Sequence, residues 1–71
     1  MDPYEELANA IILQATKDYR LALRKLAKHP YNRIGLSEKE EIEQFFRSNW
    51  FTILTGIDPE LLIEKLKAEV M

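Results

Sequence analysis

Cysteine is absent from this 71-residue chain, which also contains only one histidine and two glycines. Without cysteine there is neither a disulfide framework nor a thiolate metal site. No apolar run approaches the roughly 20 residues that a membrane-spanning helix needs. The acidic N-terminus resembles neither a signal peptide nor a transit peptide. We therefore expect a cytoplasmic protein with no membrane contact, no metal and no cofactor.

Apolar residues make up 46% of the chain, and the formal net charge is −2. This composition is typical of a globular protein and argues against disorder. A chain of this length forms one domain, so we expect residues 1–71 to fold as a single helical unit. A domain this small buries roughly 60% of its unfolded surface, which leaves a narrow margin of stability.

Capping residues mark three helix starts. Asp2 and Asp58 each precede a proline, an order in which Asp caps the helix and Pro takes its first position. Ser37 followed three residues later by Glu40 is typical of a capping box. Together with the apolar periodicity, these signals predict helices over about 3–28, 38–47 and 59–69.

Two breaks separate the predicted helices. Residues 29–36 read as a loop in which Gly35 is available for positive φ. Ser48 and Asn49 compete for backbone hydrogen bonds, so we expect either a kink or a restart there and a short helix to Thr55. Gly56 suits the left-handed position that ends that helix. The sequence thus predicts an all-α fold, a small bundle of three main helices with a short connecting helix. The first helix should run antiparallel to 37–55, and the last should close the core.

Apolar side chains at helical spacing define the expected core. In the first helix they step by four and three residues from Ala8 to Leu26, which gives one apolar stripe. All three Phe and the only Trp fall within residues 45–51, and aromatic side chains carry the largest apolar area. The alternative role for Trp50 and Phe51 is to form a platform on which a ligand stacks. The expected core residues are Ile12, Tyr19, Phe45, Phe46, Trp50, Phe51, Leu54, Leu62 and Leu66.

Charge is unevenly distributed along the chain. Residues 17–33 contain six Lys or Arg and one Asp, a net charge of +5. Such a cluster is either a nucleic-acid footprint or a solvated helix face balanced by the acids of 38–43. Those acids are interpreted as a solvated first turn that complements the helix dipole, with a metal cluster as the alternative.

The back of the first helix carries an unusual apolar pair. Leu13 and Leu21 flank Lys17 on the side opposite the apolar stripe, with Arg24 and Lys28 close by. Three explanations are open: ordinary exposed leucines, burial under the last helix, or an interface for an acidic partner or a second copy of the chain. The candidate interface residues are Leu13, Lys17, Leu21, Arg24 and Lys28.

Two segments carry a family resemblance: AIILQATKDYRLALRKL over 10–26 and EIEQFFRSNWFTILTGIDPELLIEKL over 41–66. Both resemble short uncharacterised all-helical proteins encoded by prophages and integrative elements of Gram-positive bacteria. The shared pattern is a long basic amphipathic helix followed by FFxSxWFxxLTxxDxxxLIxKL. Asn49 stands here where that group often has Asp. The group has no settled activity, and the resemblance implies an accessory protein of a mobile element that acts by binding.

Catalysis is not expected from these residues. Acid–base chemistry needs a positioned pair of groups with matched proton affinities, whereas the carboxylates are dispersed and His29 lies at a helix end, where a cation complements the dipole. The favoured interpretation is a small protein-interaction module with an unidentified protein partner or self-association as a dimer. The alternative is a nucleic-acid-associated factor that uses the basic face of the first helix.

Overall fold

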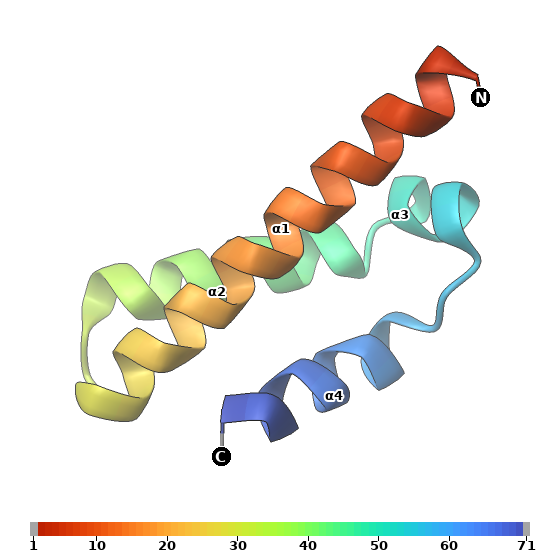
Figure 1. Ribbon diagram of the computed structural model, residues 1–71. Coiled ribbons are helices and arrows are strands. Elements are labelled where there is room, and N and C mark those ends of the chain that lie inside the picture. Colours follow the sequence, from red (N-terminus) through yellow and green to blue (C-terminus); the bar gives the residue numbers. More distant parts are fainter. Residues whose placement is uncertain (1, 71) are drawn as a thin grey trace.

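The computed structural model describes residues 2–70, with the exception of the Tyr4 side chain, and this part of the chain is helical without any strand (Figure 1). In chain order the helices are α1 (Pro3–Lys28), α2 (Arg33–Phe46), α3 (Asn49–Thr55) and α4 (Pro59–Val70). The predicted all-α bundle of three main helices and one short connecting helix is therefore confirmed.

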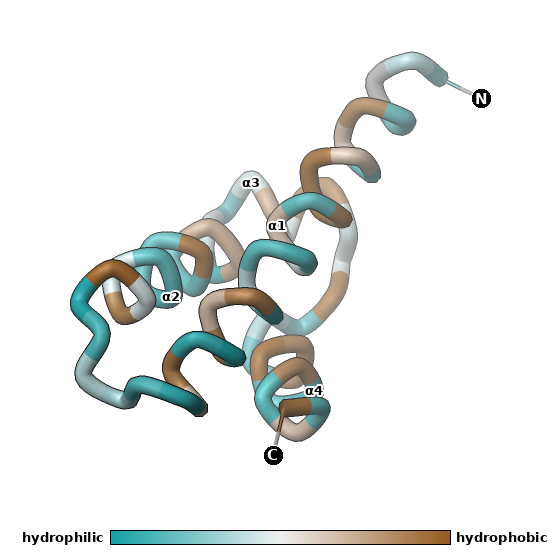
Figure 2. The backbone as a smooth tube through the Cα atoms, turned by 60° about the vertical axis from the view of Figure 1, so that its left-hand side comes forward, coloured by the Kyte–Doolittle hydropathy of each residue, from teal (hydrophilic) through white to brown (hydrophobic). Residues whose placement is uncertain are grey.

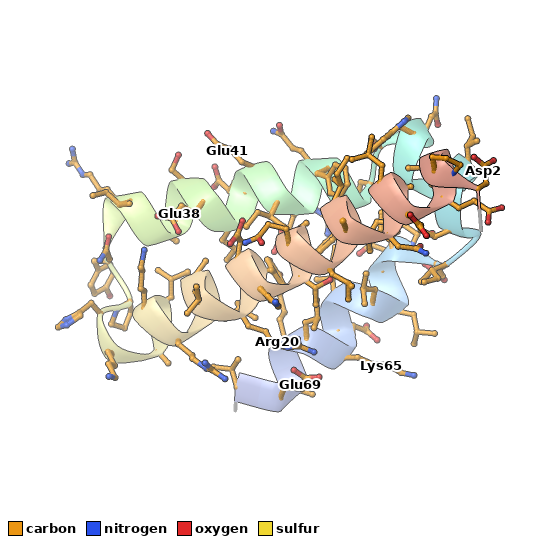
Figure 3. All side chains as sticks on the ribbon, turned by 45° about the horizontal axis from the view of Figure 1, so that its top comes forward. Asp2, Arg20, Glu38, Glu41, Lys65 and Glu69 are labelled. Atoms are coloured by element: carbon orange, nitrogen blue, oxygen red, sulfur yellow. The ribbon has the colours of Figure 1, made fainter. Side chains whose placement is uncertain are left out.

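Helix α1 extends along the full length of the fold. Its 26 residues at 1.5 Å each give about 39 Å, which matches the 40 Å long dimension of the fold. Helix α2 runs antiparallel to α1, and α4 returns along the other flank, so that α1 lies between them (Figures 1 and 3). The first turns of α1 extend beyond α2 and α4 (Figure 2).

Local capping explains three of the boundaries. The Ser48 hydroxyl accepts a hydrogen bond from the Phe51 amide at 3.2 Å, so the chain restarts at Ser48 instead of kinking. Gly56 ends α3 in the left-handed region with φ of 66°. The Asp58 carboxylate accepts from the Glu60 amide at 3.0 Å and caps α4. All three predicted signals are confirmed.

Helix α2 begins earlier than predicted. Asn32 is its N-cap and accepts from the Gly35 amide at 3.1 Å, so the capping box at Ser37 and Glu40 was wrong. The loop assignment of Gly35 was also wrong, because this glycine is buried in the first turn of α2. A Cβ at Gly35 would lie 3.3 Å from Leu26 Cδ2. The glycine therefore lets the start of α2 approach the end of α1 closely.

All four helices contribute to one core. The predicted residues Tyr19, Phe46, Phe51 and Leu66 are buried in it, while Ile12, Phe45 and Leu62 are partly buried against it. The Phe46 ring lies 5.6 Å from the ring of Tyr19 and 5.4 Å from that of Phe51, between centroids. Edge-to-face and tilted ring pairs at these separations are favourable. Leu23 and Ile63 complete the core, although neither was among the predicted core residues.

Two predicted core residues lie at the surface. Trp50 is 46% exposed and Leu54 is 38% exposed, so their assignment to the core was wrong. The prediction continued the apolar stripe of α2 through Ser48 as if one helix ran on. Because the chain restarts at Ser48, the phase changes, so that Phe51, which was also predicted for the core, points inward while Trp50 does not. Trp50 rests on the edge of the core, with its ring 5.5 Å from that of Phe45.

Candidate protein-binding surface

The leucines on the back of α1 are exposed. Leu13 keeps 61% of its surface accessible and Leu21 keeps 51%, so their burial under α4 is excluded. Lys17, Arg24 and Lys28 are exposed as well. The five residues form one surface of α1, here called the exposed face: Leu13, Lys17, Leu21, Arg24 and Lys28. The structure places these predicted interface residues together on the solvent side of the central helix.

Part of the basic cluster is neutralised by other helices. Arg20 Nε donates to Glu69 Oε2 of α4 at 2.7 Å (Figure 3), and Lys25 Nζ lies 3.2 Å from Glu38 of α2. The hydrogen bond with Glu69 raises the pKa of Arg20, and the same bond lowers the pKa of Glu69. The net charge of +5 therefore overstates the positive charge that this region presents to solvent.

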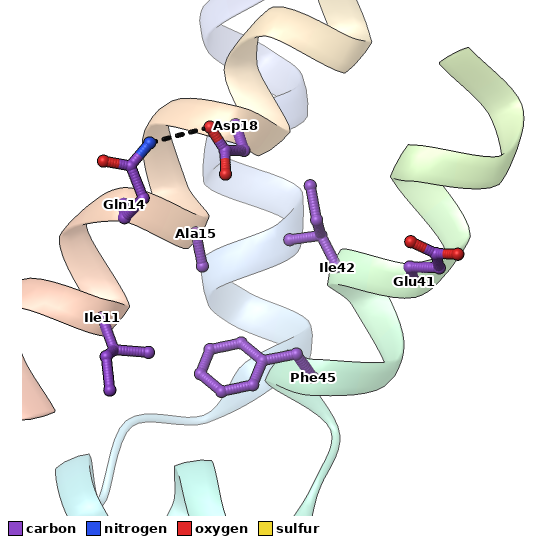
Figure 4. Close-up of a pocket in the computed structure, with 7 residues that line it drawn as sticks. All are labelled: Ile11, Gln14, Ala15, Asp18, Glu41, Ile42 and Phe45. Atoms are coloured by element: carbon purple, nitrogen blue, oxygen red, sulfur yellow. Dashed lines mark hydrogen bonds between the residues drawn. The ribbon is translucent and has the colours of Figure 1, made fainter. Parts of the chain in front are cut away.

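An apolar groove lies between α1 and α2 (Figure 4). It encloses about 340 Å³. From α2, Phe45 points toward Ile11 and Ile42 points toward Ala15 (Figure 4). We call it the α1–α2 groove, and its lining residues are Ile11, Gln14, Ala15, Asp18, Glu41, Ile42 and Phe45.

The rim of the α1–α2 groove is acidic. Asp18 and Glu41 border it from opposite helices, and no cationic side chain is among its lining residues. Asp18 Oδ1 accepts from the Gln14 side-chain amide at 2.9 Å, which orients its carboxylate (Figure 4). Two negative charges thus face solvent beside an apolar floor.

The groove and the exposed face of α1 are continuous. A smaller hollow that shares Asp18, Glu41 and Ile42 with the groove extends to Leu21 and Lys25. Leu21 also borders a shallow hollow with Arg24 and Lys28. One surface therefore runs along α1 and changes from acidic near Asp18 to basic near Lys28.

Glu43 departs from the predicted solvated cluster. The acids of 38–43 lie in the middle of α2, so they are not its first turn, and Glu43 is buried. The Tyr19 hydroxyl donates to Glu43 Oε2 at 2.6 Å. Lys39 Nζ lies 2.9 Å from the same oxygen, and Arg47 approaches the other oxygen at 3.4 Å. The interpretation of this acid as a solvated residue was wrong.

The Tyr19–Glu43 contact shifts both pKa values. Burial raises the pKa of Tyr19 far above its usual value, and the hydrogen bond to Glu43 raises it further. Burial alone would raise the pKa of Glu43. The hydrogen bonds from Tyr19 and Lys39, with the charges of Lys39 and Lys67, outweigh that effect and hold the pKa of Glu43 below its usual value. Tyr19 is fully buried and Glu43 nearly so, and this pair therefore belongs to the core.

Within residues 2–70, no group of three or more His, Asp or Glu side chains is placed to hold a metal ion. None of the helices in that range is both long and apolar enough to cross a bilayer. Comparison with models of protein families, with curated proteins and with solved structures finds no match to this chain.

Proposed function

We propose that this chain is a small non-enzymatic protein-interaction module, and that it binds its protein partner through the exposed face of α1. The observation that carries the proposal is the exposure of Leu13 and Leu21 on a helix whose opposite side packs against α2 and α4. An apolar pair of this kind with a charged surround is typical of binding surfaces.

The rigidity of α1 supports this function. The core residues Tyr19 and Leu23 fix the helix from inside, and ion pairs to Glu38 and Glu69 tie it to both neighbours. A binding face on such a helix is already ordered, so binding costs little conformational entropy. The resemblance to proteins of prophages and integrative elements supports an accessory role for a mobile element in the cytoplasm.

Nucleic-acid binding is the second candidate. Lys17, Arg24 and Lys28 follow one side of α1, where their charges would meet phosphates. The pairing of Arg20 with Glu69 and of Lys25 with Glu38 makes this footprint smaller than the sequence implied. The structure therefore favours a protein partner.

The proposal is tested with Leu13→Glu and Leu21→Glu variants. Affinity capture from cells that make the chain naturally, read by mass spectrometry, compares each variant with the parent. Leu61→Glu, at a leucine that is 50% exposed on α4, is the matched control. We expect all three variants to melt like the parent, while only the α1 variants lose the specific partner. Retention of every captured protein by both α1 variants would contradict the proposal.

Duplex DNA titrated by filter binding at two salt concentrations tests the second candidate. A nucleic-acid factor requires measurable affinity that falls steeply with salt, with a slope of about −0.9 for each phosphate contacted. We expect no binding at low salt. Binding that is lost in Lys17→Ala and Arg24→Ala would replace the protein partner with a nucleic acid.

A further inference from the structure

We propose that the α1–α2 groove binds an amphipathic helix of the partner protein, one whose apolar ridge is flanked by Lys or Arg. This inference rests on the proposed function. It adds a second contact of the same partner, in the groove that adjoins the exposed face of α1 at Leu21, and it gives the chemistry of the segment that binds there. Three properties of the groove carry it: a preformed apolar floor, an acidic rim and a length of about two helical turns.

The floor of the groove is held by the core. Phe45 contributes to the lining, and its ring lies 5.9 Å from Phe46, 5.5 Å from Trp50 and 5.8 Å from Phe51, between centroids. Ile42 is likewise packed against the buried cluster. These side chains cannot collapse into the groove without disturbing the core, so the apolar surface is preorganised for an apolar ligand.

The rim selects a cationic partner. Asp18 and Glu41 stand on opposite sides of the apolar floor. Lys25, which borders the smaller hollow beside the groove, is already paired with Glu38. A neutral or acidic helix in the groove would leave both carboxylates partly desolvated without a counter-charge. A helix with Lys or Arg beside its apolar ridge supplies that charge.

The length of the groove fits a helix. On α1 the lining residues run from Ile11 to Asp18, seven residues or about 10 Å along the axis. This is the distance covered by apolar anchors at i, i+4 and i+7, the pattern by which amphipathic helices dock in grooves. The narrow side chain of Ala15 lies midway and leaves room for the central anchor.

Charge argues against a second copy of the chain as the occupant. If two copies paired through their grooves about a two-fold axis, each residue near the axis would meet its own equivalent. The Asp18 and Glu41 carboxylates of both copies would then be brought together, and like charges in a desolvated contact are strongly unfavourable. A separate cationic helix meets no such repulsion.

Two synthetic peptides test the inference. Both are helices of about 14 residues (~21 Å), short enough to end before Arg24 and Lys28. Both carry Leu at i, i+4 and i+7; one places Lys beside the leucines and the other places Glu there. Binding is measured by fluorescence anisotropy of labelled peptides, and amide chemical shifts of the ¹⁵N-labelled chain locate the contact. We expect the Lys peptide to bind at least about tenfold more tightly and to shift the amides of the groove residues.

Charge reversal at the rim supplies the matched control. Glu41→Lys should weaken binding of the Lys peptide at least about tenfold and should strengthen binding of the Glu peptide. Glu40→Lys changes the same charge on the neighbouring residue of α2, which is exposed and outside the groove lining. It should leave both affinities nearly unchanged. Equal weakening by the two variants would show that only net charge matters, and it would overturn the inference.

Three other outcomes would overturn it: no binding by either peptide, equal binding by both, or self-association of the chain through the groove in sedimentation. These outcomes are separable from failure of the proposed function. If Leu21→Glu abolishes capture of the native partner while the Lys peptide does not bind, the groove inference fails and the interaction module stands. If the parent chain captures no specific partner, the proposed function fails as well.

Discussion

Two carboxylates on α2, only two residues apart, have opposite surroundings. Glu43 is buried, accepts a hydrogen bond from Tyr19 and lies among Lys39, Arg47 and Lys67. Glu41 is exposed on the rim of the α1–α2 groove, where no cation lines the wall. The comparison shows that a rotation of about 200° around one helix separates a residue that holds the fold from one on the rim of an open groove.

The polar centre around Glu43 is complete. Among the described residues, every buried side-chain nitrogen or oxygen has a hydrogen-bond partner. Glu43 connects α1 through Tyr19 and α4 through Lys67, while Arg47 also reaches Glu60 at 2.6 Å. A buried charge that is both paired and hydrogen-bonded is tolerated in a core, and removal of one partner leaves an uncompensated group. Glu41 on the groove rim is exposed, so we expect that its charge can change without loss of the fold.

The largest expected effect comes from the apolar side of the core. Phe46→Ala removes a fully buried ring and should lower the free energy of unfolding by about 3–5 kcal/mol. Trp50→Ala removes a larger ring that is half exposed, so it should cost less than half as much. Urea denaturation with the intrinsic circular dichroism signal measures both. Equal losses would mean that Trp50 belongs to the core after all.

The next effect concerns the polar centre itself. Tyr19→Phe keeps the ring in the core but removes the hydrogen bond to Glu43, and we expect a loss of about 1–3 kcal/mol. Tyr31→Phe is the control, because the Tyr31 side chain is 91% exposed. It should change stability by no more than about 0.5 kcal/mol. If the two variants unfold at the same urea concentration, the Tyr19 hydrogen bond contributes nothing to stability.

Local signals account for what could be predicted from the sequence. The boundaries of α1 and α4 and the left-handed Gly56 depend on a few neighbouring residues, and each was anticipated. An interruption at Ser48 was also expected, although the sequence left open whether the helix kinks or restarts there. Angular position around one helix placed Leu13 opposite the apolar stripe, but it left burial under the last helix open, and only the packing of α4 decided for exposure.

The start of α2 was missed because residues 29–36 contain Pro30 and Gly35 and so resemble a loop, although Gly35 belongs to the helix. The Asn32 cap was overlooked beside the stronger-looking box at Ser37.

The remaining features depend on how helices meet. Tyr19 and Glu43 are 24 residues apart, and within α2 Glu43 looks like one acid in an acidic run. The groove likewise joins Asp18 of α1 to Glu41 of α2, and no spacing within either helix relates them. Trp50 is exposed because the apolar stripe changes phase at Ser48. Predicting that change requires the angle between α2 and α3, which the sequence does not give. For the groove, the indication available in the sequence was the position of Ile11 and Asp18 beside the apolar stripe of α1.

Acidification should weaken the polar centre. Glu43 has a pKa below its unfolded value of about 4.3, so the folded state binds fewer protons there than the unfolded state. Its contribution to stability is present above about pH 4.3 and is lost as the pH falls through the folded pKa. Urea midpoints between about pH 6 and pH 3 should decline more gently in Glu43→Gln than in the parent. The decline of the urea midpoint that remains in Glu43→Gln at low pH should come from Glu60 and Glu69, whose pKa values are lowered by hydrogen bonds from Arg47 and Arg20.

The smallest expected effect on stability is that of Glu41→Gln, which is compared directly with Glu43→Gln. Glu41→Gln and Glu43→Gln are the same chemical change on one helix. At Glu41 the side chain is exposed, so stability at pH 7 should change by no more than about 0.5 kcal/mol. At Glu43 the charge that balances Lys39, Arg47 and Lys67 is removed, so the loss should be clearly larger. Matched urea titrations of the two variants measure the difference. An equal loss at both positions would mean that the groove rim is part of the structural framework, and that its acidic charge has a role in folding before any role in binding.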